Sequence, residues 1–203
     1  MTATATLQPA TLLPGLPDPV LDSQRVFRAV LDAMARPGTI LDLPLPIPAP
    51  APLGVATTAI ALALADYETR LWLDPAADTD AVRQHLRFHC GCPLTGEAAA
   101  ADFAIVTDAA SMPPLAAFKA GSDEYPDRST TLIVQLPALE GGEPLTLAGP
   151  GIRDCVRIAP AGLPAGFRRW LADNHAGFPC GVDLIFTCGD RLTALPRSTR
   201  LEG

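Results

Sequence analysis

Apolar residues recur at helical spacing in several parts of the chain, between residues that start or stop helices. After Asp18-Pro19, apolar positions return every three or four residues up to Met34. Asp can cap a helix and Pro is favoured at its first position. We predict that this helix ends at Arg36, because Pro37-Gly38 does not continue one. Further helices are predicted over residues 54–65, 78–88, 111–120 and 163–175.

Short apolar runs between these helices predict strands. The run at 131–136 is continuous, as in a strand buried on both faces. Segments 182–187 and 191–195 flank Gly189-Asp190 and predict a hairpin. Other strands are predicted over residues 39–45, 70–73, 103–107, 145–147 and 155–158. Strands and helices alternate through the middle and hairpins follow, so the pattern predicts a layered α/β domain with a mixed sheet.

Two segments lie outside this alternation. Residues 1–16 predict a loose N-terminal arm, followed by a single α/β domain over residues 17–203. Residues 44–52 contain five prolines, which lack the amide hydrogens needed at the centre of a sheet. We predict an extended surface segment that acts as a stiff connector, with a ligand for a proline-binding module as the alternative.

Composition narrows the classes of function. Of 203 residues, 48% are apolar and 18% are charged, which excludes an intrinsically disordered chain. The net charge of −7, without a basic run, argues against nucleic-acid binding. No apolar stretch is long enough to cross a membrane, and the N-terminus does not resemble a secretory signal. The five cysteines are an odd number, so we predict reduced thiols and a cytoplasmic protein.

The chain has fourteen arginines and a single lysine, Lys119, which is therefore the one side-chain amine available for Schiff-base chemistry. A pyridoxal-phosphate enzyme could use Lys119 with Asp183 opposite the ring nitrogen. However, no glycine- or serine-rich phosphate loop follows Lys119 at a suitable distance, and the chain is short for that chemistry.

Other polar motifs each have a structural alternative. His89-Cys-Gly-Cys92, with His85 one helical turn earlier, could bind a metal, but a zinc site needs four ligands and no second cysteine pair exists. Gly149-Pro-Gly151 could approach a phosphate, or form a tight turn. Arg197-Ser-Thr-Arg200 could hold a phosphate, a carboxylate or the acidic groups of a partner. No nucleophile motif occurs, so we assign no catalytic, cofactor-binding or metal-binding residue.

Several segments, in this order, resemble one family, the H subunit of the bacterial carbon–phosphorus lyase system (PhnH), over residues 15–200. The segments that carry the resemblance are Asp22-Ser-Gln24, Phe27-Arg28, Met34-Ala-Arg-Pro-Gly38, Ala101-Asp-Phe-Ala104, Phe118-Lys-Ala-Gly121, Glu124-Tyr-Pro126, Thr130-Thr-Leu132, Leu147-Ala-Gly-Pro-Gly-Ile152, Phe178-Pro-Cys-Gly-Val-Asp183 and Leu195-Pro-Arg-Ser-Thr199. Two positions depart from the family pattern: Ser198 replaces a threonine and Cys180 replaces a residue that is usually aliphatic.

The resemblance implies a three-layer α/β/α fold, similar to the large domain of pyridoxal-phosphate-dependent transferases but without the cofactor. It implies a homodimer that joins the G, I and J subunits in a core complex. With the G, I and L subunits, the family supports synthesis of ribose 1-methylphosphonate 5-triphosphate from a nucleoside triphosphate and an alkylphosphonate. The nucleosidase-like chemistry is attributed to the I subunit and the radical step to the J subunit, and no catalytic residue is known in H.

We therefore predict an accessory subunit of organic phosphonate catabolism that is non-catalytic alone. One alternative is a phosphate- or phosphonate-binding module that uses Lys119 with Arg197 and Arg200. A stand-alone pyridoxal-phosphate enzyme is the other. The candidate anion or partner contacts are Lys119, Arg197, Ser198, Thr199 and Arg200.

Overall fold

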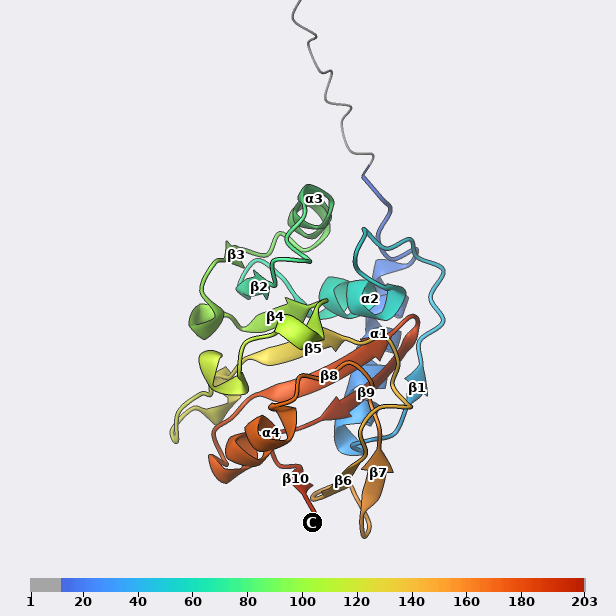
Figure 1. Ribbon diagram of the computed structural model, residues 1–203. Coiled ribbons are helices and arrows are strands. Elements are labelled where there is room, and N and C mark those ends of the chain that lie inside the picture. Colours follow the sequence, from blue (N-terminus) through green and yellow to red (C-terminus); the bar gives the residue numbers. More distant parts are fainter. Residues whose placement is uncertain (1–11, 203) are drawn as a thin grey trace, which may run out of the picture.

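Helix α1 (Pro19–Ala35) begins and ends where the sequence predicted. In the computed structural model, which describes residues 12–202 (Figure 1), the carboxylate of Asp18 accepts hydrogen bonds from the backbone N–H of Val20 and Leu21. Of the predicted N-terminal arm, residues 1–11 lie outside the described residues. Within the rest of that arm, the carbonyl oxygen of Leu13 lies 2.9 Å from Nε2 of His89.

Three other predicted helices are confirmed within a few residues: α2 (Val55–Leu64), α3 (Asp80–His89) and α4 (Phe167–Ala176). The predicted helix at 111–120 is wrong. Residues there form two 3₁₀ turns, η2 (Ala109–Ser111) and η3 (Leu115–Ala117). Pro113 and Pro114 separate them, because proline supplies no N–H for the helical ladder and disfavours helical backbone before it. The other 3₁₀ turns are η1 (Ala98–Ala100) and η4 (Pro126–Arg128).

The larger sheet has seven strands in the order β1-β9-β8-β5-β4-β2-β3, and it is mixed, as predicted. Strands β3, β2, β4, β5 and β8 are parallel to one another, whereas β9 runs antiparallel to both β8 and β1. The predicted hairpin is β8 with β9. Their bounds are β1 (Leu41–Asp42), β2 (Leu71–Leu73), β3 (Leu94–Thr95), β4 (Phe103–Val106), β5 (Thr131–Gln135), β8 (Asp183–Cys188) and β9 (Arg191–Leu195).

A smaller antiparallel sheet has the order β10-β6-β7 and comprises β6 (Leu145–Ala148), β7 (Val156–Ile158) and β10 (Arg200–Leu201). The sequence did not predict β10, nor did it predict β3 in the larger sheet. Gly149-Pro-Gly151 forms the turn after β6. Gly151 has a φ of +81°, and a Cβ there would overlap the carbonyl oxygen of Ala35 at the end of α1. The structure therefore gives this motif a role as a turn.

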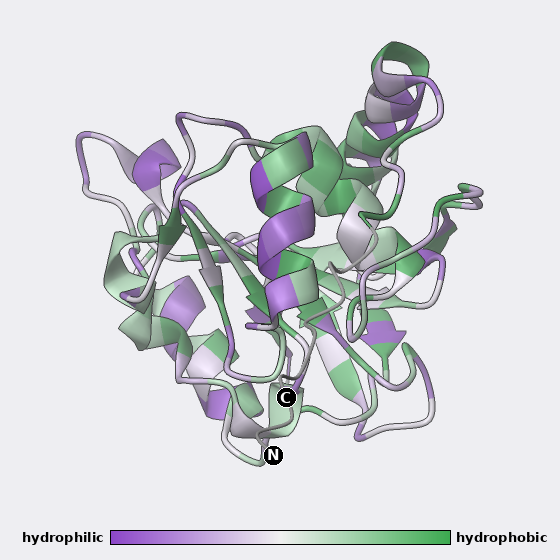
Figure 2. Cartoon of the chain, turned by 90° about the horizontal axis from the view of Figure 1, so that it is seen from above, coloured by the Kyte–Doolittle hydropathy of each residue, from purple (hydrophilic) through white to green (hydrophobic). Residues whose placement is uncertain are grey.

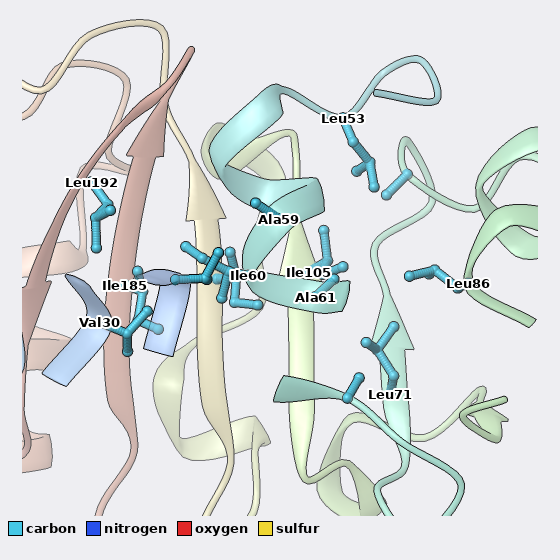
Figure 3. Close-up of a cluster of buried hydrophobic side chains, with 14 of the residues drawn as sticks. Val30, Leu53, Ala59, Ile60, Ala61, Leu71, Leu86, Ile105, Ile185 and Leu192 are labelled. Carbon is cyan, nitrogen blue, oxygen red and sulfur yellow. The ribbon is translucent and has the colours of Figure 1, made fainter. Parts of the chain in front are cut away.

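Side chains alternate between the two faces of the larger sheet and form two buried clusters. On one face, Leu71, Ile105 and Ile185 pack with α1, α2 and α3 (Figure 3). On the other face, Leu132 and Phe186 pack with α4, η3 and the smaller sheet. The strands at the centre are largely hydrophobic, and hydrophilic residues gather on outer loops and on the outer sides of helices (Figure 2). The chain is thus layered, with helices on both faces of a mixed sheet.

The proline-rich segment lies in no helix or strand, and it is more than a surface connector. Ile47 within it and Leu43 just before it are buried in the cluster beneath α1 and α2. The N–H of Leu43 also donates to the carbonyl oxygen of Asp190, at a distance of 2.7 Å. Among residues 12–202, no helix is both long and apolar enough to span a bilayer.

Candidate functional site

Many of the segments that carry the family resemblance meet at one edge of the larger sheet, where the parallel strands β4, β5 and β8 begin. The N–H of Gly181 donates to the carbonyl oxygen of Ala120 at 2.8 Å, and the N–H of Thr130 donates to that of Lys119 at 2.7 Å. Ala120 and Ser129 form an isolated bridge, so residues 120–129 make a closed loop. We call this region the amino-end cluster, and it is the candidate functional site.

Lys119 lies in the amino-end cluster, where its ammonium pairs with the carboxylate of Asp102, just before β4. The second carboxylate oxygen accepts from the backbone N–H of Arg70 at 2.9 Å. Burial by itself raises the pKa of Asp102, but the hydrogen bonds from Lys119 and Arg70 outweigh burial and hold the pKa below its ordinary value. The single lysine is therefore engaged with a carboxylate that stays ionised.

Arg197 lies in the same cluster and closes it from the opposite side. Its Nε and Nη2 donate to the two carboxylate oxygens of Asp183, the first residue of β8, and its backbone N–H donates to Oδ1 at 2.8 Å. Its Nη1 donates to the carbonyl oxygen of Pro126 in the closed loop. The side chains of Arg197 and Asp183 are only 15% and 19% exposed, so this ion pair is largely shielded from water.

The other three candidate contacts lie along the segment that leads into β10. Ser198 is half-buried, and a Cβ on Gly149 would lie 2.8 Å from its carbonyl oxygen. Thr199 is buried, and its hydroxyl has no hydrogen-bond partner among the described residues. Arg200 is exposed and pairs with Glu202 at 3.0 Å. The structure thus brings Lys119 and Arg197 into one cluster and places Arg200 in the smaller sheet.

Each cationic candidate already has a carboxylate partner in residues 12–202. Lys119 pairs with Asp102, Arg197 with Asp183 and Arg200 with Glu202. An anion that bound to these cations would have to share them with the carboxylates or displace them. The hydrogen bonds of the amino-end cluster hold the loop at 120–129 against the ends of the strands.

A pocket of about 430 Å³ opens beside the amino-end cluster, between η3, the 180–182 segment and α4. Its lining is mainly apolar and includes Leu115, Trp170 and Val182. The side-chain amide of Asn174 fixes one wall, because it donates to the carbonyl oxygen of Val182 at 3.0 Å and accepts from the N–H of Val182 at 2.8 Å. Trp170 and Asn174 were not predicted as site residues, because only the folded chain shows that both line this pocket.

Exposed aromatic side chains also lie in segments of the amino-end cluster. Phe178 precedes the Gly181 segment, and Tyr125 lies in the closed loop. The guanidinium carbon of Arg128 is 4.0 Å from the centre of the Tyr125 ring. Tyrosine, phenylalanine and arginine are enriched at protein interfaces. The surroundings of the cluster therefore have the composition of a docking surface. Tyr125 and Phe178 both lie in segments that carry the family resemblance, and this was the sequence signal that could have identified them.

The opposite edge, where the parallel strands end, is filled by internal hydrogen bonds. The buried carboxylate of Asp74 accepts from the N–H groups of Ala77, Thr107 and Asp108 at 2.7–2.8 Å. Oε1 of Gln135 accepts from the N–H of Gly54, at the start of α2, at 2.7 Å. Donors at this edge that could have received a ligand are thus used by the protein itself.

The predicted histidine and cysteine motif lies at the end of α3. His85 is buried, and its ring centre is 4.4 Å from that of His89. Burial lowers the pKa of His85 to about 4, and the neighbouring His89 contributes to the same shift. Cys90 is half-buried and Cys92 is buried. Across the described part of the chain, no three histidine, cysteine or acidic side chains are placed to hold a metal ion.

Residues 14–202 match the family described as "Bacterial phosphonate metabolism protein (PhnH)". The chain is 45% identical over 185 residues to the alpha-D-ribose 1-methylphosphonate 5-triphosphate synthase subunit PhnH of Rhizobium meliloti. The aligned residues make up 91% of this chain and 92% of that protein. It is 33% identical over 82 residues to the putative C-P lyase subunit protein HtxG of Stutzerimonas stutzeri. These aligned residues make up 40% of this chain and 42% of that protein.

Proposed function

Because the chain belongs to the PhnH family of bacterial phosphonate metabolism proteins, we propose that it is an accessory subunit in the breakdown of organic phosphonates. In this role it supports formation of ribose 1-methylphosphonate 5-triphosphate from a nucleoside triphosphate and an alkylphosphonate. The observation that carries the proposal is 45% identity to a subunit of that synthase over nearly the full length of both proteins.

The geometry supports a role without catalysis by the isolated chain. At the amino-end cluster, Lys119 and Arg197 are paired with Asp102 and Asp183, and at the opposite edge Asp74 is used internally. The same arrangement disfavours a pyridoxal-phosphate enzyme, because the side-chain nitrogen that would have to form the Schiff base is engaged by the carboxylate of Asp102.

We also propose the finer features that the family resemblance implies. The chain forms a homodimer, joins the G, I and J subunits in a core complex, acts together with the L subunit and works in the cytoplasm. Its fold is proposed to correspond to the large domain of pyridoxal-phosphate-dependent transferases without the cofactor. Lys119, Arg197, Ser198, Thr199 and Arg200 remain the proposed partner contacts, and contact with an anion through these residues is the alternative that a titration tests.

Co-expression tests the proposed function. The chain is produced with the G, I and L subunits, with each omitted in turn, and formation of ribose 1-methylphosphonate 5-triphosphate is followed by ³¹P NMR. We expect product from the full set, none from the isolated chain, and co-purification with G, I and J when J is added. Product formation by the isolated chain would overturn the accessory role, and unchanged yield without this chain would remove it from the synthesis.

A titration distinguishes the anion-binding alternative. Inorganic phosphate, methylphosphonate and ATP are titrated calorimetrically into the native chain and into an Arg197→Ala/Arg200→Ala variant. We expect no binding heat that depends on these arginines, because Asp183 and Glu202 occupy them. Heat that is present in the native chain and absent from the variant would instead support the binding module.

A further inference from the structure

Helix α1 exposes an unusual amount of apolar surface. Of the eight large hydrophobic side chains that are exposed in the described residues, four lie on this one helix. Val20 is 77% exposed, and Leu21, Phe27 and Leu31 are 50–52% exposed. Single exposed apolar residues are ordinary, but a contiguous group of them marks an interaction surface.

Five residues of α1 follow the spacing of a helix–helix seam. Val20, Gln24, Phe27, Leu31 and Met34 are separated by four, three, four and three residues, which places them along one stripe of the helix. The first four are exposed, whereas Met34 is half-buried at the edge of the core cluster. We call these five residues the α1 stripe. At 1.5 Å per residue, the stripe runs for about 21 Å.

The core uses little of the α1 stripe, because only Met34, at the end of the stripe, packs against the core cluster. Another face of α1, formed by Val26, Val30 and Ala33, is buried in the cluster that α1 shares with α2 and the larger sheet. Figure 1 shows α1 packed along the same side of the sheet as α2. The helix is therefore apolar on two sides, and residues 12–202 cover only one of them.

The α1 stripe is nearly symmetric about its middle. Phe27 is the central residue of α1, Val20 and Met34 lie seven residues to either side, and Gln24 and Leu31 lie three and four residues away. A two-fold axis through Phe27, perpendicular to the helix, would therefore lay the whole stripe against itself in an antiparallel pair. Such self-complementarity is what an interface between two identical copies requires.

The charges at the ends of α1 match the same arrangement. Asp18 and Arg36 flank the helix at nine residues to either side of Phe27. Arg36 pairs with Asp32 of its own helix at 3.2 Å, but both side chains are more than half exposed, so the Arg36 guanidinium can also face a second carboxylate. In an antiparallel pair, Asp18 of one copy lies at the end where Arg36 of the other copy lies, so opposite charges meet at both ends. The two helix dipoles also oppose each other, which is favourable.

We propose that the α1 stripe is the surface on which a second copy of this chain docks, with the two α1 helices antiparallel about Phe27. This inference rests on the proposed homodimer and adds where its interface lies. The occupant is a second copy because the stripe and the end charges are complementary to themselves. Phe27, at the centre, is the expected hot spot, since central aromatic residues dominate binding energy.

Sedimentation equilibrium over a range of concentrations measures the dimer of the full-length chain. The test variant is Phe27→Glu, and the matched control is Phe88→Glu, which changes the same residue type on α3, where Phe88 is 68% exposed. We expect Phe27→Glu to raise the dimer dissociation constant at least about a hundredfold, because the change removes two hot-spot side chains, one per copy. Phe88→Glu should leave the dissociation constant unchanged within about twofold.

A charge rescue tests the register. Arg36→Glu should weaken the dimer, because it opposes Asp18 of the other copy, and adding Asp18→Asn should restore much of the loss. Asparagine caps helices about as well as aspartate, so the second change leaves the start of α1 intact. Urea unfolding of each variant, at a concentration where it is monomeric, checks that the chain stays folded.

The outcomes separate the inference from the proposed function. A dimer that Phe27→Glu and Phe88→Glu weaken equally, or not at all, overturns the α1 interface and leaves the homodimer standing. A native chain that is monomeric at every concentration overturns both the interface and the homodimer. Neither result bears on synthesis by the assembled subunits, which the co-expression experiment measures independently.

Discussion

Replacing Asp183 with Asn isolates the charge that closes the amino-end cluster. Asp183 accepts three hydrogen bonds from Arg197, from its backbone N–H, Nε and Nη2. Asparagine keeps the size of the side chain and one acceptor oxygen, so the bond from the backbone N–H survives. The other end becomes an NH₂ donor that faces the donor Nη2, and the guanidinium loses its counter-ion.

The magnitude follows from burial. With Arg197 only 15% exposed, the unpaired guanidinium is poorly hydrated after the substitution. Breaking one partner of a buried ion pair costs about 3–5 kcal/mol, and the small residual exposure places this pair at about 3 kcal/mol. For a chain of this length, such a loss lowers the melting temperature by about 6–12 °C.

Urea unfolding, followed by the fluorescence of Trp72 and Trp170 and by circular dichroism, measures the free energy of unfolding. The matched control is Asp173→Asn on α4, where Arg169 and Asp173 are 3.7 Å apart and 86% and 69% exposed. That exposed pair should contribute about 0.5 kcal/mol or less. The same chemical change is thus made once in a shielded pair and once in a solvated pair.

A second variant separates the two sources of the effect. Adding Arg197→Met to Asp183→Asn removes the stranded charge, so we expect the double variant to be more stable than Asp183→Asn alone. The reasoning is refuted if Asp183→Asn costs less than about 1 kcal/mol, or no more than Asp173→Asn. A double variant that is no more stable than the single one would show that packing, not the unpaired charge, sets the cost.

Two further predictions concern the turn after β6 and the buried histidine. Gly151→Ala should lower the free energy of unfolding in urea by about 3 kcal/mol or more, because a Cβ would overlap the carbonyl oxygen of Ala35. The control, Gly141→Ala, is also at positive φ but in open space and should cost about 1 kcal/mol. Equal losses for the two variants would contradict the overlap. His85 has its pKa lowered to about 4, so below its ordinary value of 6.5 the unfolded chain takes up this proton first and stability falls as the pH falls from 6.5 to 4. The free energy of unfolding, measured between pH 7.5 and 4.5, should fall with decreasing pH by up to about 1.4 kcal/mol per pH unit because of His85, and His85→Leu should remove this part of the decrease. Parallel plots of the free energy of unfolding against pH for the native chain and the variant would rule out this role of His85.

Local signals in the sequence account for most of the elements. The start and end of α1 follow from Asp18 and Pro37-Gly38, because capping and the missing proline N–H act within a few residues. Strands β3 and β10 were not predicted, since each has two residues and exists only through its pairing with β2 or β6. Such short pairings depend on tertiary context and leave no period in the sequence.

The candidate site was predictable only in part, for a related reason. The sequence singled out Lys119 as the one lysine and Arg197 as part of an Arg-Ser-Thr-Arg motif. Their partners, Asp102 and Asp183, are 17 and 14 residues away. The parallel pairing of β4 with β5 brings Lys119 to Asp102, and the antiparallel pairing of β8 with β9 brings Arg197 to Asp183. A cation in a sequence therefore indicates an anion site only when its neighbours in space are known.

The two edges of the larger sheet differ in what they leave for binding. In parallel α/β sheets, ligands usually bind beyond the carboxyl ends of the strands, but here Asp74 and Gln135 fill that edge with internal hydrogen bonds. At the amino-end cluster Lys119 and Arg197 are also paired internally, whereas Tyr125 and Phe178 remain exposed. Exposed aromatic and aliphatic groups gain most by binding other proteins. Within residues 12–202, the surfaces best suited to binding are therefore apolar, and this is the property that an accessory subunit requires.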